Sequence, residues 1–210
     1  MYDRMLKVHS TSTRSSHRDN LRRRARKDVA YRCRLMLYEL LNQNAQSALE
    51  IYEDLMSRKP HFSLDTYMSD GDIRDCEFLL GEAYHQRGKL AEAARLYEKI
   101  LEKEKKRAYF RRFAQEIRLM LKNVYIQYIT RADSSEEILI SLNRILELDL
   151  SSRETAWIHK KAAEAYYRTK DMGRARESLN RAFQINPKLT GAKKISRKLG
   201  IENRILEPGL

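Results

Sequence analysis

Apolar residues recur at spacings of three and four along most of the chain, a spacing typical of amphipathic helices. The clearest row consists of Phe113, Ile117, Leu121, Val124 and Tyr128. A polar break at 133–135 separates it from a second row, formed by Ile138, Leu142 and Ile145. Gly and Pro, which interrupt helices, number only seven and three, and no Gly precedes Gly71. The pattern therefore predicts an almost wholly helical chain.

The first residues lack this pattern. Residues 10–16 read Ser-Thr-Ser-Thr-Arg-Ser-Ser and have no periodic apolar face. Such a segment is expected to be mobile, or to become ordered only on a partner. Ser16 and Asp19 have the spacing of a capping pair, so a helix is expected to start just after Ser16. We therefore assign residues 1–18 to a polar, basic N-terminal arm.

A helical-hairpin pattern recurs further along, in which Leu-Gly-x2-Tyr is followed by Ala-x3-aromatic. The best copy lies at 74–107 and contains Leu80, Gly81, Tyr84, Gly88, Ala93 and Tyr97. Small residues at Gly81 and Ala93 would let the two helices approach closely, and Gly88 fits the turn between them. This stretch is expected to form two antiparallel helices.

A second good copy lies at 156–189, where the same offsets hold Ala162, Ala163, Tyr166, Ala175 and Leu179. Its turn, Lys170-Asp171, has no Gly, and Asn186-Pro187 is expected to stop its second helix. A degenerate copy at 29–62 has Glu39 where the pattern has Tyr. The fourth unit, 108–155, is inferred by elimination.

With these repeats, the chain resembles a tetratricopeptide-repeat (TPR) protein with irregular repeats. The resemblance covers about 29–189 if all four units count, and about a third of the chain if only the two good copies do. It implies an all-α solenoid of about four antiparallel helical hairpins over 19–199. A helix over 188–199 would cap its last apolar face, and 200–210 would form a tail.

In the TPR family, the first helices of successive repeats line a groove that holds a peptide. The resemblance places these residues in a partner-binding groove: Phe78, Glu82, His85, Asn123, Gln127, Arg131, Trp157, Lys160, Lys161, Tyr167 and Arg168. Such a mixed aromatic and basic groove would suit an acidic or aromatic-containing peptide. Alternatively, Trp157 and Phe78 pack against neighbouring repeats. Family members that bind chaperone C-termini use Lys and Asn where this chain has Cys33 and Leu37, so that activity is not predicted.

The equivalent face of the first repeat is too apolar to stay exposed to water. It consists of Ala30, Cys33, Leu37, Leu40 and Leu41. We expect it to be covered by another protein or by N-terminal residues, namely Met1, Tyr2, Met5, Leu6 and Val8.

The charge of the chain lies at its ends. Of the net +13, residues 1–34 carry +8, residues 35–187 carry +1 and residues 188–210 carry +4. The N-terminal cluster, called the basic arm below, consists of Arg18, Arg22, Arg23, Arg24, Arg26 and Lys27. A C-terminal basic patch consists of Lys193, Lys194, Arg197 and Lys198. In the first turns of a helix, the arm would oppose the helix dipole, a repulsion that an acidic group could offset.

The basic arm either serves solubility alone or binds one of three targets, which are acidic protein, nucleic acid and membrane. Nucleic-acid binding usually adds aromatic residues that stack on bases, and only Tyr31 lies nearby in sequence. Phosphates can still be bound through charge alone. Membrane contact is the weakest hypothesis, because Leu21 alone would bury little apolar area.

Signatures of catalysis are missing from the sequence, and the five histidines are scattered, so neither an enzyme nor a bound cofactor or metal is predicted. The acidic run 69–72 lacks the ligand spacing of a calcium loop and is expected to start a helix before Ile73. Cys33 and Cys76 are expected to be reduced, packed thiols. With no long apolar run or secretory signal, we expect a cytoplasmic protein.

The combined prediction is a non-catalytic adaptor or scaffold subunit within a larger complex. It would bind a partner segment in its groove and dock through its basic ends on an acidic surface. The alternative is a protein that uses the basic arm to bind the backbone of RNA or DNA. Self-association is left open.

Overall fold

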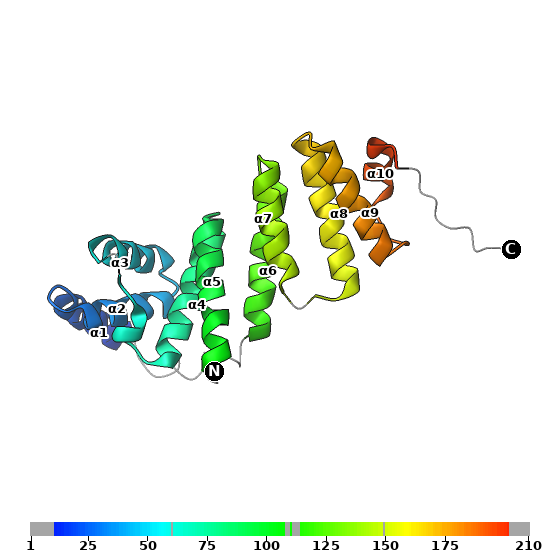
Figure 1. The fold of residues 1–210 in the computed structure, drawn as a ribbon. Coiled ribbons are helices and arrows are strands. Elements are labelled where there is room, and N and C mark those ends of the chain that lie inside the picture. Colours follow the sequence, from blue (N-terminus) through cyan, green and yellow to red (C-terminus); the bar gives the residue numbers. More distant parts are fainter. Residues whose placement is uncertain (1–10, 60, 108–109, 111–113, 149, 202–210) are drawn as a thin grey trace. The chain divides into compact units, whose positions relative to one another are not determined.

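The computed structural model describes residues 11–59, 61–107, 110, 114–148 and 150–201. Within these ranges the protein is all-helical, with ten α-helices, short 3-10 turns and no strand (Figure 1). The chain forms two compact units, residues 1–114 and 115–210. The prediction of an all-α protein is therefore confirmed.

The first unit contains two helical hairpins, α2–α3 and α4–α5, and one preceding helix. The elements are α1 (Thr11–Ala25), α2 (Val29–Leu41), α3 (Ala45–Arg58), the 3-10 segment η2 (Leu64–Thr66), α4 (Asp70–Gln86) and α5 (Leu90–Lys106). Ser69 caps α4 by accepting a hydrogen bond from the backbone N–H of Asp72. The helix start predicted at 69–72 is therefore confirmed.

The packing of α4 on α5 depends on one glycine. A Cβ atom placed on Gly81 would lie 2.6 Å from Cε1 of Tyr97, and both residues are buried. The tyrosine ring thus occupies the space that any larger residue at position 81 would need. The close approach predicted from the small residue is confirmed.

The second unit contains α7 (Ser135–Leu146), α8 (Ser152–Arg168), α9 (Met172–Ile185), α10 (Lys193–Leu199) and all but the first residue of α6 (Ala114–Arg131). Helices α8 and α9 pack through residues with no exposed surface, namely Ala162, Ala163, Ala175, Leu179 and Ala182. Lys170 takes φ 65° at their turn, where Gly88 takes φ 73° in the α4–α5 turn. The hairpin therefore forms without the glycine, at a cost in backbone strain.

Two predicted boundaries are wrong. The helix expected over 188–199 is limited to Lys193–Leu199, although it ends as predicted at Gly200, with φ 63°. At the other end of the chain, α1 begins at Thr11, inside the segment expected to be mobile and before the start expected at Ser16. Helix α1 is polar on most of its surface, so its sequence shows little of the apolar period that reveals the other helices.

The position of the basic arm on its helix also differs from the prediction. Arg22, Arg23 and Arg24 lie in the last turn of α1. Positive charge there is favoured by the helix dipole instead of opposed by it. No dipole penalty therefore needs to be offset by an acidic group.

Helix α1 packs on α2, next to the face of α2 predicted to be too apolar to stay exposed. Leu21 and Ala25 are buried with Leu35. Cys33 and Leu40 are buried, whereas Ala30, Leu37 and Leu41 stay partly exposed. The N-terminal residues expected as a cover, Met1 to Val8, lie outside the described residues.

Candidate partner-binding surfaces

The residues predicted for a groove are divided between the two units. Phe78, Glu82 and His85 lie on α4, in the first unit; Asn123, Gln127 and Arg131 lie on α6, and the others on α8, in the second. On α4, Phe78 packs against Tyr97 of its own hairpin, with ring centroids 6.2 Å apart. Burial raises the pKa of the neighbouring Glu82.

Several predicted residues on α8 already have partners. Lys161 lies 5.5 Å from the ring centroid of Trp157, and its Nζ is 3.0 Å from a carboxylate oxygen of Glu164. Arg168 donates hydrogen bonds to the carbonyls of Thr130 and Ala132, at the C-terminal end of α6. Arg168 thus caps the C-terminal end of a neighbouring helix.

A hollow of about 690 Å³ opens beside Trp157, and we call it the Trp157 hollow. Its lining comes from α6, α8 and the segment after α9, and consists of Lys122, Ile126, Arg153, Glu154, Trp157, Ile158, Asn186, Lys188, Leu189 and Thr190. Sequence reasoning singled out only Trp157 of this set, because the hollow forms only where α6 and the segment after α9, both far away in sequence, meet α8.

The charge of the Trp157 hollow is positive. Lys122 pairs with Glu154, and hydrogen bonds from Lys122 and Ser151 lower the pKa of that carboxyl to about 2. Arg153 and Lys188 are exposed and have no ion-pair partner among the described residues. The hollow thus combines a half-buried indole with two uncompensated cations.

Part of the basic arm is neutralised inside the first unit. Nε and Nη2 of Arg18 donate to the two carboxylate oxygens of Glu39, at 2.7 and 2.8 Å, and this raises the pKa of Arg18. Arg22 lies 3.8 Å from the same carboxylate, which is 1% exposed. Glu39, which stands where the sequence pattern has Tyr, thus ties α1 to α2 through these ion pairs.

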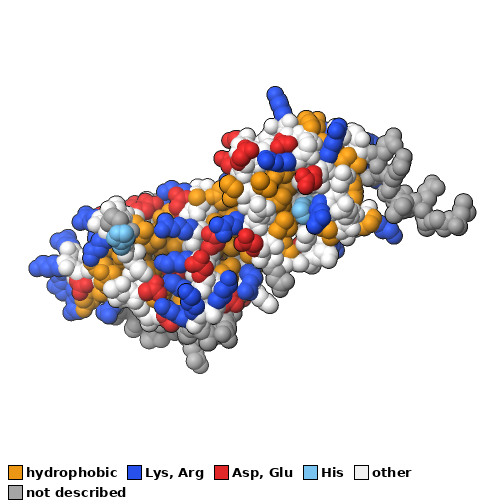
Figure 2. Space-filling model, in the orientation of Figure 1, with side chains coloured by type: hydrophobic (Ala, Val, Ile, Leu, Met, Phe, Trp, Pro, Cys, Tyr) orange, Lys and Arg blue, Asp and Glu red, His pale blue; other side chains and the backbone are white. Residues whose placement is uncertain are grey.

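A second hollow, of about 790 Å³, lies in the first unit, and we call it the α1–α2 hollow. Leucines line it together with aromatic and basic residues: His17, Asn20, Leu21, Arg24, Tyr31, Arg34, Leu37, Tyr38 and Leu41. Its other wall comes from the segment before α4 and the start of that helix, as Thr66, Tyr67, Met68, Ser69 and Asp72. In Figure 2, Lys and Arg side chains gather at the end of the unit formed by α1 to α3.

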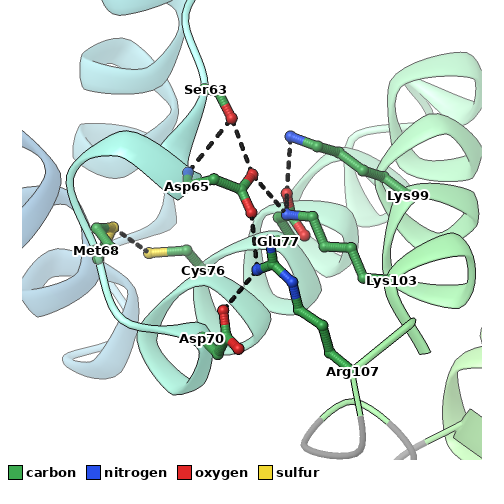
Figure 3. A network of polar contacts seen from close by, with 9 residues as sticks. All are labelled: Ser63, Asp65, Met68, Asp70, Cys76, Glu77, Lys99, Lys103 and Arg107. Atoms are coloured by element: carbon green, nitrogen blue, oxygen red, sulfur yellow. Dashed lines mark hydrogen bonds and ion pairs between the residues drawn. The ribbon is translucent and has the colours of Figure 1, made fainter. Parts of the chain in front are cut away.

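An ionic network holds that second wall in place (Figure 3). Asp65, the middle residue of η2, pairs with Lys103 at 3.1 Å and with Arg107 at 3.0 Å. Burial alone would raise the pKa of Asp65, but hydrogen bonds from Lys103 and Ser63 lower it to about 2. Glu77 has no exposed surface and binds Nζ of Lys99 and Lys103 at 2.8 and 2.9 Å. The network therefore fixes the segment that carries Thr66 to Ser69.

The other residues singled out in the sequence add no reactive cluster. Cys33 and Cys76 are free, buried thiols, as predicted, and burial raises the pKa of Cys33 to about 11. Within the described ranges, no three His, Cys, Asp or Glu side chains are placed to hold a metal ion. The C-terminal patch residues Lys193, Lys194, Arg197 and Lys198 are exposed on α10, and Lys198 lies 5.2 Å from the ring of Tyr167.

Among the described helices, none is both long enough and apolar enough to cross a membrane. A scan against family models gave no match to this chain, and a search of curated proteins gave no match either.

Proposed function

We propose that this protein is a non-catalytic adaptor with TPR-like helical hairpins that binds a segment of a partner protein in the Trp157 hollow. The observation that carries the proposal is the combination found there: Trp157, half-buried, beside Arg153 and Lys188, neither of which has an acidic partner among the described residues. Aromatic anchors surrounded by polar groups are the usual centres of protein-binding surfaces.

The lining of the hollow indicates the chemistry of the partner. Ile126, Ile158 and Leu189 extend the apolar surface beside Trp157 and would accept one bulky apolar side chain. Arg153 and Lys188 would attract carboxylates on either side of that anchor. Glu154 does not cancel this attraction, because Lys122 already neutralises it. The expected partner segment therefore has an apolar residue flanked by Asp or Glu.

Selection from a displayed peptide library, with the full chain as bait, tests this proposal. We expect enrichment of peptides with acidic residues next to a bulky apolar residue. The double charge reversal Arg153→Glu and Lys188→Glu should switch the preference to basic peptides. Lys193→Glu with Lys194→Glu changes the same charge on α10, outside the lining of the hollow, and should leave the preference unchanged.

Binding of a selected peptide is then measured through the fluorescence of Trp157, the only Trp of the chain. The peptide should change this emission, and its affinity should fall at least about tenfold in the Arg153 and Lys188 variant. Enrichment of the same peptides by wild type and by that variant would contradict the proposal.

A further inference from the structure

The basic surface of the first unit is left without a role by the proposed function. Arg18 and Arg22 bind Glu39, and Arg32 pairs with Asp54. Five other cations on or between α1 and α2 have no carboxylate partner among the described residues: Arg23, Arg24, Arg26, Lys27 and Arg34. Such a concentration of like charge favours an anionic ligand.

Two of these cations are held in place by one aromatic ring. Arg24 donates a hydrogen bond to Oη of Tyr31 at 2.6 Å, and its guanidinium carbon lies 5.2 Å from the ring centroid. The guanidinium carbon of Arg34 lies at the same distance, 5.2 Å, from that centroid. Tyr31 therefore positions two guanidinium groups at the α1–α2 hollow before any ligand arrives, which lowers the entropy cost of binding a phosphate.

The α1–α2 hollow also offers surfaces for a nucleobase. Leu21, Leu37 and Leu41 provide apolar surface, and Tyr38 and Tyr67, both partly exposed, add aromatic rings to the lining. The volume of about 790 Å³ exceeds what a single phosphate group needs. The aromatic residues that the sequence seemed to lack near the basic arm are thus brought to it by α2 and by the segment before α4.

We propose that the α1–α2 hollow binds single-stranded nucleic acid. Arg24 and Arg34 would bind one phosphate, and its base would lie against Leu37 and Tyr38. Neighbouring phosphates of the same strand would pair with the exposed Arg23, Arg26 and Lys27, which lie outside the lining of the hollow. The partly exposed rings of Tyr38 and Tyr67 in the lining favour a strand over an acidic or phosphorylated peptide, because a strand carries a base beside every phosphate. A duplex would not place a base in the hollow.

This proposal concerns residues of the first unit, whereas the proposed function concerns the Trp157 hollow in the second unit. Its failure and the failure of peptide binding at Trp157 are therefore distinguishable. The two sites together would connect a protein partner to a nucleic acid.

The test measures binding of the full chain to labelled oligonucleotides of about 15 residues by fluorescence anisotropy, at about 50 and 200 mM salt. The probes are single-stranded RNA, single-stranded DNA of the same sequence, their duplexes and polyglutamate. We expect single strands to bind at least about tenfold more tightly than duplexes, and polyglutamate to bind more weakly still. The slope of log affinity against log salt should be about −3, as expected for four to five phosphate contacts.

Two variants with the same loss of charge distinguish a site from general attraction. Arg24→Gln with Arg34→Gln should weaken single-strand binding at least about tenfold, because the phosphate loses both guanidinium groups. Arg95→Gln with Lys105→Gln removes two exposed cations from α5 and should weaken it less than about threefold. Tyr31→Phe keeps the ring but removes the hydrogen bond to Arg24, so it should have an intermediate effect. Circular dichroism checks that every variant stays folded.

Tight binding of single-stranded RNA, single-stranded DNA or both supports the site. The nucleic acid with the higher affinity is then its ligand. The proposal is overturned by equal weakening in the two double variants, by equal binding of duplexes, or by tighter binding of polyglutamate. It is also overturned if no single strand binds at the lower salt concentration.

Discussion

The two units build similar helical hairpins on different kinds of core. The first unit buries charged side chains: Glu39, Arg74 and Glu77 are 1%, 7% and 0% exposed. In the second unit, the α8–α9 hairpin is packed mainly through alanines, and the buried polar residues described are three serines and Lys160. Ion pairs tie distant segments such as α1 and η2 to the first unit, whereas small side chains hold α8 close to α9.

Two matching positions in the α4–α5 and α8–α9 hairpins show how side-chain volume is divided between the paired helices. Gly81 faces Tyr97 on α5, and the same offsets in the second unit hold Ala163 and Leu179. All four residues are buried. The smaller glycine is matched with the larger tyrosine, and the larger alanine with the smaller leucine, so the summed side-chain volume at these two positions is similar in both hairpins.

The largest expected effect comes from leaving the buried carboxylate of Glu77 without cations. Replacing both Lys99 and Lys103 with Met should destabilise the protein by about 3 kcal/mol, since an uncompensated charge would remain in the core. Urea unfolding followed by circular dichroism measures the loss. Adding Glu77→Gln to the double variant should restore at least half of it. No recovery would show that the lysines stabilise the unit in some other way.

A somewhat smaller effect is expected from Gly81→Ala, about 2 kcal/mol, because the added methyl group would collide with the buried ring of Tyr97. Amide hydrogen exchange should accelerate in α4 and α5 and stay unchanged in α8 and α9. A second change, Tyr97→Leu, makes room for the methyl group, so the pair should be less destabilised than the sum of the single variants. Strict additivity would argue against the collision.

Asp65 should make the stability of the first unit depend on pH in the acidic range. Its folded pKa of about 2 lies below its unfolded value of 3.8, so its contribution is fully present above about pH 4 and is lost as pH falls through 2. We expect Asp65→Asn to cost about 1–2 kcal/mol at neutral pH, allowing for partial screening. The difference from wild type should shrink towards zero near pH 2. A constant difference across this range would contradict the ionic explanation.

The smallest effect is expected from removing a helix cap, and the same substitution can be made in both units. Ser69 and Ser151 cap α4 and α8 through hydrogen bonds to backbone N–H groups, so Ser→Ala at either should cost about 1 kcal/mol. Trp157 fluorescence reports on the second unit, because it is the only Trp in the chain. Ser151→Ala should lower the urea midpoint of that signal. Ser69→Ala should change mainly the circular dichroism, and equal changes in the fluorescence midpoint would show that the two units unfold together.

Predictions from the sequence succeeded where the deciding contacts are local. Apolar spacing located the helices, Ser69 and Gly200 located helix ends, and the small residue at Gly81 indicated close packing. Prediction failed at α1, whose start was placed too late. That helix is held by Arg18 on Glu39 and by Leu21 on α2, contacts with residues more than ten positions away.

The sequence by itself determined the helical class, the hairpins and the excess of positive charge at the ends, because spacing and composition act over a few residues. Only the tertiary structure decided which charges are neutralised and which side chains line the hollows. Arg18 and Arg24 look alike in the sequence, yet one binds a buried carboxylate and the other lies beside Tyr31 at a hollow. That distinction depends on chain segments that folding brings together, since the free energy of a charge is set by its neighbours in space.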